Sequence, residues 1–178
     1  RKYLVEKYGF NKIYKQGFTI KTPINLELQS IATQSLREGL EKYDRRKGWR
    51  GPILNREITK QWNKNLQKYK LEKTIGWNLA IVKKINKFSV EIETEKKNQG
   101  IIKYKNVSWI KKELDQIFKE GDVIYVKKIK DNSYSLKQIP KANGGIVVLN
   151  PYTGRVLAMS GGFSFKLSEF NRATQALR

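Results

Sequence analysis

The stretch GWNLAIVKKINKFSVEIETEKKNQGIIKY, residues 76–104, decides the fold that this sequence predicts. Its apolar side chains recur at every second position: Trp77, Leu79 and Ile81, then Phe88, Val90 and Ile92, then Ile102 and Tyr104. A period of two is typical of β-strands, and each run ends in Lys, Asn or Gly, which favour turns. Residues 76–104 therefore predict three consecutive strands.

The residues that follow complete a small barrel. The helical spacing of apolar residues predicts a short helix over 108–118. Turns at Gly121 and Asp131 lead into predicted strands at 123–129 and 134–139. Three strands, a helix and two further strands are the order of a small five-stranded OB-like barrel. The predicted fold class is therefore α+β and mainly β.

The residues before the barrel predict a helical connector. Residues 17–22 alternate and predict a short strand, while residues 25–46 predict a helix that the Asn25 side chain caps. Arginines, glycines and a proline within 44–52 end this helix, because proline cannot continue it. A second, weaker helix is predicted over 58–69.

The residues after the barrel predict a β-hairpin, with strands at 144–150 and 155–160. The first strand is apolar throughout, a pattern that favours burial on both faces. A hairpin alone is marginal in water, so we expect residues 144–178 to be poorly ordered or to pack on a neighbour. The predicted units of the chain are three: residues 1–73, 74–140 and 141–178.

The composition limits the chemistry that this chain can perform. Its 178 residues are 39% hydrophobic, which is enough for a core. The sequence contains no histidine and no cysteine, so it lacks the commonest general base, the commonest metal ligand and any thiolate. Its apolar runs are too short for a transmembrane helix. We expect no catalytic residue, no cofactor and no metal site here.

The net charge of +21 suggests nucleic acid or an anionic membrane surface as a partner. Most of the 37 cations are lysines, however, whereas proteins that read bases and phosphates favour the planar fork of arginine. The cations are also spread along the whole chain. The charge therefore favours a diffuse, solvated basic surface over a dedicated polyanion site.

Three stretches of the chain resemble one family. GGIVVLNPYTGRVLAMSGGFSFKLSEFNRATQALR, residues 144–178, looks like the opening of the transpeptidase domain of class A penicillin-binding proteins, the bifunctional peptidoglycan synthases of the Gram-negative type 1a sort. GFTIKTPINLELQSIATQSLREGLEKYDRRKGWRGP, residues 17–52, resembles the connector after their glycosyltransferase domain. Residues 74–140 resemble their non-catalytic OB-like insert. Asn25 stands where the family usually has Asp, and both residues cap helices.

The resemblance implies that the chain stops just before the nucleophile of the transpeptidase Ser-x-x-Lys motif, which would follow a short Gln-Pro-Gly turn. Ser108-Trp109-Ile110-Lys111 is itself a Ser-x-x-Lys, but the chain has no Ser-x-Asn or Lys-Thr-Gly motif to accompany it. We interpret it as the first turn of a surface helix. The absence of a catalytic residue in this chain is thus an expectation from the resemblance as well as from the composition.

The resemblance also implies a role and partners. The role is that of a non-catalytic interdomain region in peptidoglycan synthesis, which spaces and orients the catalytic domains of the parent synthase. The parent would lie at the periplasmic face of the bacterial inner membrane, held by an anchor outside this chain. In some members of the family the insert contacts an outer-membrane lipoprotein activator, so such a partner is a further expectation.

Two other functions stay open at this point. The first is a basic OB-type nucleic-acid-binding module, in which aromatic side chains in a cationic groove stack on bases. The candidate stacking residues are Trp77, Tyr104, Trp109, Tyr125 and Tyr134, most of them at positions predicted to point inward. The second is a peripheral module that its lysines hold on anionic lipid, although the sequence has no long amphipathic basic helix. The resemblance favours neither, and we expect no nucleic acid as a partner.

Overall fold

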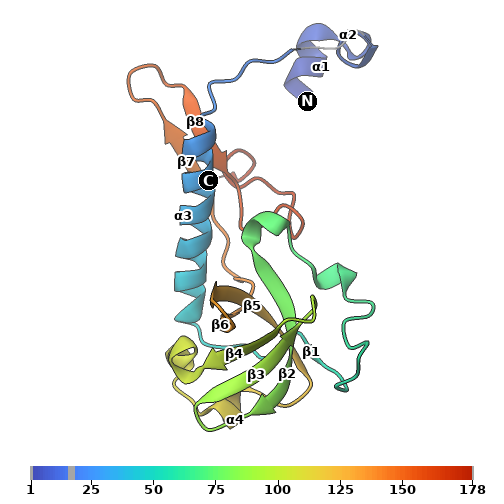
Figure 1. Ribbon diagram of the computed structural model, residues 1–178. Coiled ribbons are helices and arrows are strands. Elements are labelled where there is room, and N and C mark those ends of the chain that lie inside the picture. Colours follow the sequence, from blue (N-terminus) through green and yellow to red (C-terminus); the bar gives the residue numbers. More distant parts are fainter. Residues whose placement is uncertain (1, 16–18, 178) are drawn as a thin grey trace.

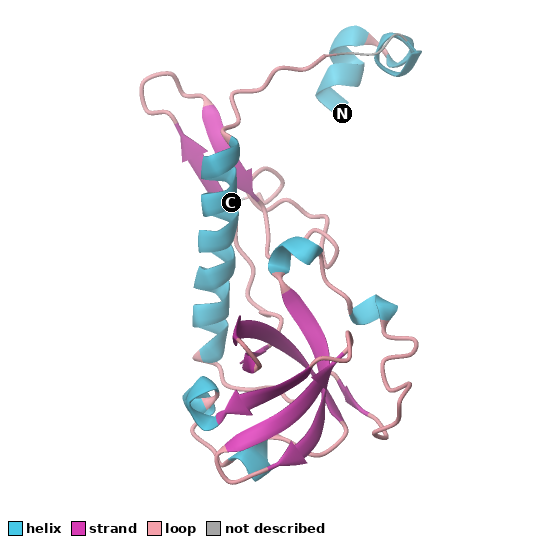
Figure 2. Cartoon of the chain, viewed as in Figure 1, coloured by secondary structure: helices cyan, strands magenta, loops and turns pink. Residues whose placement is uncertain are grey.

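The computed structural model describes residues 2–15 and 19–177. It consists of a β-barrel, a long helix that leads away from it, and a β-hairpin beside the far end of that helix (Figures 1 and 2). Two short helices precede these parts, α1 (Lys2–Tyr8) and α2 (Phe10–Lys15). The predicted α+β and mainly β fold class is confirmed.

The barrel is a closed ring of five strands. The strands are β2 (Trp77–Ile85), β3 (Ser89–Thr94), β4 (Gln99–Lys103), β5 (Asp122–Lys130) and β6 (Ser133–Lys137). β2 pairs with β3 and β5, β3 pairs with β4, and β5 pairs with β6, all antiparallel. A parallel contact of Ile101 with Ser133 joins β4 to β6 and closes the ring. This connectivity confirms the predicted OB-like barrel.

The barrel interior is filled by inward side chains from all five strands. They form one apolar cluster: Ala80, Val82, Val90, Ile92, Ile102, Ile124, Val126, Tyr134 and Leu136. Gly100 on β4 makes room for the largest of them, because a Cβ atom there would lie 2.3 Å from Cε2 of Tyr134. A glycine is therefore required where the Tyr134 ring crosses β4.

The predicted helix over 108–118 is shorter and broken. Two 3₁₀ turns come first, η3 (Tyr104–Asn106) and η4 (Ser108–Ile110), and the α-helix α4 covers only Leu114–Ile117. Lys111 separates η4 from α4 with a positive φ of 56°, which no right-handed helix tolerates. The apolar spacing correctly predicts which residues are buried, since they pack against the barrel interior, but the backbone is not one helix.

A second apolar cluster lies outside the barrel, against β2 and β5. Residues 53–71, which we call the covering layer, pack over the outward side chains of Leu79, Ile81, Val123 and Tyr125. Trp62 and Leu66 of the layer are each only 1% exposed. The layer includes β1 (Leu54–Asn55), which pairs with β5. The layer lies before the predicted boundary at residue 74 and packs against the outside of the barrel.

The helix predicted over 58–69 does not form. Residues 60–65 are turns, and only η1 (Gln67–Tyr69), a 3₁₀ turn, is helical. Arg56 Nη1 donates to the carbonyl oxygens of Trp62 and Lys64, at 3.1 and 2.7 Å, and Asn65 has a φ of 63°. These contacts fold the segment into a loop that places Trp62 on the barrel.

The long helix is α3 (Leu26–Arg45), which confirms the helix predicted over 25–46. Asn25 Oδ1 accepts a hydrogen bond from the Leu28 backbone nitrogen at 3.0 Å, so Asn25 is the cap. The strand predicted at 17–22 is not found where the chain is described: residues 19–22 lie in no strand, and residues 17 and 18 lie outside the described residues. A strand needs a hydrogen-bonded partner, and the described chain places none beside residues 19–22.

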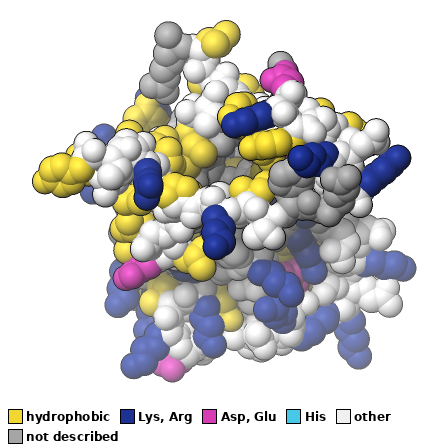
Figure 3. Space-filling view, turned by 90° about the horizontal axis from the view of Figure 1, so that it is seen from above, with side chains coloured by type: hydrophobic (Ala, Val, Ile, Leu, Met, Phe, Trp, Pro, Cys, Tyr) yellow, Lys and Arg dark blue, Asp and Glu magenta, His cyan; other side chains and the backbone are white. Residues whose placement is uncertain are grey.

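The predicted hairpin forms from β7 (Ile146–Leu149) and β8 (Val156–Ser160). It packs on α3 of the same chain, which corrects the expectation of a poorly ordered segment that needs a neighbour. Burial of both faces of β7 is wrong for these residues, because Val147 and Leu149 are 41% and 54% exposed. Seen from this end of the molecule, hydrophobic side chains gather on the surface (Figure 3).

Candidate functional site

Three parts of the chain meet along α3, and we call this meeting place the junction. It joins α3 to the entry of the barrel, to the exit of the barrel, and to the hairpin with the loop after it. In residues 2–15 and 19–177 no group of three or more His, Cys, Asp or Glu could hold a metal ion. The junction holds the barrel and the hairpin on α3 through hydrogen bonds and apolar contacts.

Asp44 ties the end of α3 to the chain that leaves the barrel. The residue is 2% exposed. Arg50 Nη1 donates to its Oδ1 at 2.9 Å, Gln138 Nε2 donates to its Oδ2 at 2.8 Å, and the Lys141 backbone nitrogen donates to Oδ1 at 3.1 Å. Arg50 Nη2 also donates to the Ile139 carbonyl oxygen at 2.6 Å. One buried carboxylate thus fixes where the barrel sits on the helix.

The protonation state of Asp44 follows from these donors. Burial alone would raise the pKa of the carboxyl group, because it removes the hydration of the charged form. The hydrogen bonds from Arg50, Lys141 and Gln138, with the charge of Arg50, outweigh burial and hold the pKa of Asp44 below its ordinary value. Asp44 is therefore ionised at neutral pH and acts as a permanent acceptor.

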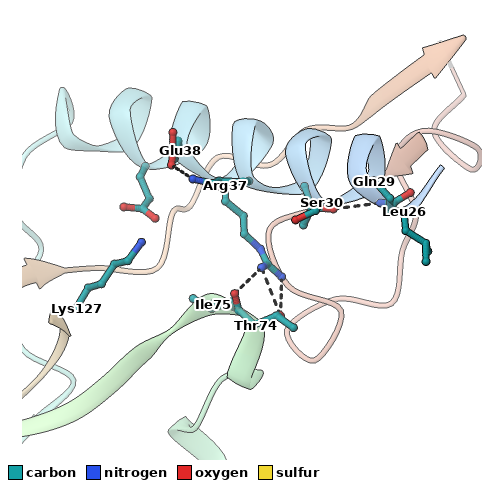
Figure 4. A pocket seen from close by; sticks show the side chains of 11 residues that line it. Leu26, Gln29, Ser30, Arg37, Glu38, Thr74, Ile75 and Lys127 are labelled. Atoms are coloured by element: carbon teal, nitrogen blue, oxygen red, sulfur yellow. Dashed lines mark hydrogen bonds between the residues drawn. The ribbon is translucent and has the colours of Figure 1, made fainter. Parts of the chain in front are cut away.

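Arg37 crosses a groove between α3 and the entry of the barrel (Figure 4). Its Nε donates to the Phe163 carbonyl oxygen at 2.9 Å, and its Nη1 donates to the Thr74 carbonyl oxygen at 3.3 Å. Glu38, Ser30 and other polar side chains of α3 line the same groove. Arg37 thereby connects the barrel entry to the loop after β8.

Glu72 holds the same loop from the barrel side. Ser164 Oγ donates to its two carboxylate oxygens at 2.9 and 2.7 Å, and the Lys166 backbone nitrogen donates to Oε1 at 2.8 Å. Burial would raise the pKa of Glu72, but these hydrogen bonds and the nearby charge of Arg37 hold it below its ordinary value. The loop is therefore pinned between two ionised side chains of opposite sign.

A second ion pair and an apolar cluster complete the junction. Lys137 Nζ, at the end of β6, donates to Glu41 Oε2 of α3 at 2.5 Å. Burial lowers the pKa of Lys137, an effect that Glu41 opposes. Beside this pair Leu40, Ile75 and Phe163 form a small buried cluster, with Trp77 packed against it. Both α3 and the entry of the barrel thus contribute charged and apolar side chains.

The hairpin edge is closed by a side chain of α3. Gln29 Nε2 donates to the Met159 carbonyl oxygen, and Gln29 Oε1 accepts from the Met159 backbone nitrogen, both at 2.9 Å. The Asn25 backbone nitrogen donates to the Leu157 carbonyl oxygen at 2.8 Å. The start of α3 thus satisfies the outer edge of β8 in the way that a neighbouring strand would.

The Ser-x-x-Lys at 108–111 lies beside the barrel, with its serine in the 3₁₀ turn η4. Ser108 is exposed, and its Oγ donates to the Lys105 carbonyl oxygen at 3.1 Å. Trp109 packs against the barrel interior, with the Arg45 guanidinium 5.5 Å from its ring centroid. The serine hydroxyl therefore serves to close a turn.

The five aromatic residues considered for base stacking serve packing. Tyr134 is inside the barrel, and Tyr104 and Trp109 pack against that interior. Trp77 and Tyr125 point outward, which corrects their predicted inward position, but the covering layer packs over them.

The usual nucleic-acid face of an OB barrel is the outer face of its second and third strands, here β3 and β4. The outward side chains along these two strands are Ser89, Glu91, Glu93, Gln99, Ile101 and Lys103. None of them is aromatic, and the two carboxylates repel phosphate. The face therefore lacks the stacking platform that the nucleic-acid alternative requires.

Sequence reasoning missed the polar residues that build the junction. Asp44 carried one signal that could have revealed it: it follows Leu36 and Leu40 at intervals of four and so lies on the apolar stripe of α3. An acidic residue on a buried stripe predicts a buried partner. Arg37 and Glu72 carried no such signal, because their partners in the loop after β8 lie more than 90 residues away.

Comparisons with known proteins agree with this architecture. Residues 49–142 match the family described as the penicillin-binding protein OB-like domain. The chain is 38% identical over 171 residues to penicillin-binding protein 1A of Rickettsia prowazekii, covering 94% of this chain and 22% of that protein. It is 31% identical over 195 residues to penicillin-binding protein 1A of Escherichia coli, covering 100% of this chain and 23% of that protein.

A solved structure agrees as well. The crystal structure of penicillin-binding protein 1A from Haemophilus influenzae matches with a TM-score of 0.82 and 28% identity, over 100% of this chain and 27% of that one. This chain thus spans about a fifth of the length of its curated relatives. None of its described helices is both long and apolar enough to cross a membrane. The chain belongs to the penicillin-binding protein OB-like domain family.

Proposed function

We propose that this chain is the non-catalytic interdomain region of a bifunctional peptidoglycan synthase. Such an enzyme joins a glycosyltransferase to a penicillin-sensitive D-Ala-D-Ala transpeptidase in cell-wall synthesis. The proposed role of the chain is to set the spacing and orientation of the catalytic domains. The observation that carries this proposal is the junction, in which ionised side chains fix a barrel and a hairpin on one helix.

The argument is mechanical. With 20 residues, α3 is about 30 Å long, since an α-helix rises about 1.5 Å per residue. Gln29 holds the hairpin near one end, and Asp44 holds the barrel at the other. Arg37 and Glu72 bind the loop after the hairpin between them. A helix that is held at both ends keeps the barrel and the hairpin at a fixed distance and orientation, which a flexible linker cannot do.

The location and partners of the parent protein belong to the same proposal. We place the parent at the periplasmic face of the bacterial inner membrane, held by an anchor outside this chain. Its own catalytic domains are the first partners of the chain. An outer-membrane lipoprotein activator is a candidate second partner. The basis is the similarity to proteins named penicillin-binding protein 1A over 94% or more of this chain.

The absence of catalysis in this chain is tested with fluorescent penicillin. We expect the isolated chain to remain unlabelled, and the parent protein, which includes the rest of the transpeptidase domain, to become covalently labelled. Covalent labelling of the isolated chain would contradict the proposed role, because it would require a nucleophile within these 178 residues.

The orienting role is tested in the parent protein with Asp44→Ala. We expect the rate of peptide cross-linking during coupled synthesis to fall, while acylation by penicillin stays unchanged, since the transpeptidase itself is intact. Asp115→Ala is the matched control, because Asp115 is an exposed acid on the barrel. Equal cross-linking by the Asp44→Ala protein and the parent would show that the junction does not orient the domains.

A further inference from the structure

A pocket of about 470 Å³ opens on the outside of the barrel, at the end where the chain enters β2. Its lining comes from three places: residues 70–73 before β2, the start of β2 with Tyr125 of β5 beside it, and residues 95–96 in the turn between β3 and β4. Pockets of this size can hold a small ligand. We call it the lysine pocket, because Lys70, Lys73 and Lys96 belong to its lining.

The charges of the lysine pocket leave two cations without an acidic partner. Lys70 Nζ lies 2.8 Å from Glu95 Oε2, and this ion pair joins two walls of the pocket. Lys73 and Lys96 are exposed, and neither forms an ion pair within residues 2–15 and 19–177. The pocket therefore carries two unpaired ammonium groups, which favour an anionic ligand.

The same pocket has an aromatic side. Trp77 and Tyr125 lie on the outward face of β2 and β5, with their ring centroids 5.9 Å apart. Trp77 is half-buried, so part of it stays accessible to a ligand. Gly76 leaves open space beside it, since a Cβ atom there would meet nothing within 4 Å except its own chain neighbours. An apolar group of a ligand can therefore be buried here, next to the charges of the lysines.

The backbone of β2 is open on one side at this pocket. The register of β2 with β3 begins at Ala80. One hydrogen bond extends it, from the Glu95 backbone nitrogen to the Leu79 carbonyl oxygen at 2.8 Å. Backbone groups of a strand point alternately to its two sides, so those of Trp77 point to the same side as those of Leu79. No strand of the described chain pairs with Trp77 on that side, and an extended peptide can exchange main-chain hydrogen bonds with such an edge.

These three features together select the class of ligand. A peptide with acidic side chains offers carboxylates to the lysines, an apolar side chain to Trp77 and a backbone to the edge of β2. A nucleic acid has no peptide groups for a strand edge. In addition, no arginine, whose planar fork suits phosphate, belongs to the lining of the pocket.

We propose that the lysine pocket binds a short acidic peptide in an extended conformation. The carboxylates of the peptide lie against Lys73 and Lys96, and one of its apolar side chains lies against Trp77. Its backbone pairs with the open edge of β2. This inference goes beyond the proposed function and rests on the pocket alone.

The proposal is tested by NMR titration of this chain with a blocked Glu-Leu-Glu-Leu tetrapeptide at physiological salt. We expect the double variant Lys73→Gln with Lys96→Gln to lose about fivefold in affinity, since two exposed charge contacts are removed. Lys84→Gln with Lys119→Gln is the matched control, because both lysines are exposed, lie outside the pocket lining and change the net charge equally. The control should change affinity by less than about twofold.

The same titration locates the peptide on the parent chain. We expect the largest shift changes at the backbone amides of Gly76, Trp77 and Lys96 and at the Trp77 indole. The neutral counterpart Gln-Leu-Gln-Leu should bind at least about fivefold more weakly, because it lacks the carboxylates. Thermal melting confirms that each variant is folded.

Four results would overturn the proposal. One is an equal loss of affinity in the pocket variant and its matched control, which would mean general charge attraction. Another is equal affinity for the acidic and the neutral tetrapeptide, and a third is no binding of the acidic one. The fourth is a set of shift changes confined to residues outside the pocket. None of these measurements involves penicillin labelling or cross-linking, so the two proposals can fail separately.

Discussion

The barrel and the junction differ in the contacts that hold them together. In the barrel, apolar side chains fill the interior and the space under the covering layer. In the junction, ionised side chains that include Asp44, Arg37 and Glu72 connect the segments, beside a small apolar cluster. Apolar contacts tolerate any partner of suitable shape, whereas a buried charge requires a specific donor or acceptor. The barrel therefore provides stability, and the junction provides a defined geometry.

The largest effect is expected in the covering layer. Trp62→Ala removes a side chain that is 1% exposed and that donates to Glu93 Oε1 at 2.8 Å. We expect a loss of about 3 to 5 kcal/mol in the free energy of unfolding, because the cavity opens beside β2 and β5. Urea denaturation followed by circular dichroism measures it. A loss below about 1 kcal/mol would show that the layer is not part of the barrel's stability.

The second effect belongs to the junction. Asp44→Ala leaves Arg50, Gln138 and the Lys141 backbone nitrogen without their acceptor. We expect a loss of about 2 to 3 kcal/mol in the same urea experiment, somewhat below a fully buried pair because Arg50 is partly exposed. Asp115→Ala serves again as the control and should stay within about 0.5 kcal/mol.

A smaller effect is expected from overpacking in the barrel. Gly100→Ala places a Cβ atom against the Tyr134 ring, which is 3% exposed and has little room to move. We expect a loss of about 1 to 2 kcal/mol, measured by thermal or urea unfolding. The double variant Gly100→Ala with Tyr134→Leu should lose no more than Tyr134→Leu alone. An additive loss would place the strain elsewhere.

The smallest expected effect is a change in the acid response of stability, which we expect in a variant of the junction and not in a variant of the barrel. The pKa of Asp44 is held below its ordinary value in the folded chain, so its stabilisation is complete above the unfolded pKa, about 4. It is lost as the pH falls through the folded pKa. Asp44→Asn should therefore show a flatter stability profile below about pH 4, whereas Trp62→Ala should keep the parent slope. Parallel profiles for Asp44→Asn and the parent would contradict the assignment.

The sequence predicted the barrel strands because every second residue along them is apolar and each run ends at a turn. It could not tell which face of β2 points inward, because residues 79–82 are all apolar and all buried. The helix predicted over 58–69 does not form, because apolar residues at helical spacing can also be buried from a loop. Trp62 and Leu66 have this spacing and pack on the barrel from a loop. Apolar spacing reports burial more reliably than it reports backbone conformation.

Periodicity along the sequence could not predict the polar contacts of the junction. Glu72 finds Ser164, and Arg37 finds the Phe163 carbonyl oxygen, only after the chain has folded through the barrel and the hairpin. The position of Asp44 on the apolar stripe of α3 was the one local sign of a buried partner. A single sequence shows that burying such a charged residue costs free energy, but it does not show which hydrogen-bond donor offsets that cost.

The sequence by itself determined the barrel, the capped helix and the hairpin, because each depends on local periodicity, turns and caps within a few residues. Only the tertiary structure decided which strands of the barrel are covered, how the hairpin is held on α3, and which charged side chains meet at the junction. The physical reason is distance along the chain. Local patterns specify conformation and burial, whereas hydrogen bonds between residues more than 90 positions apart exist only in the folded state.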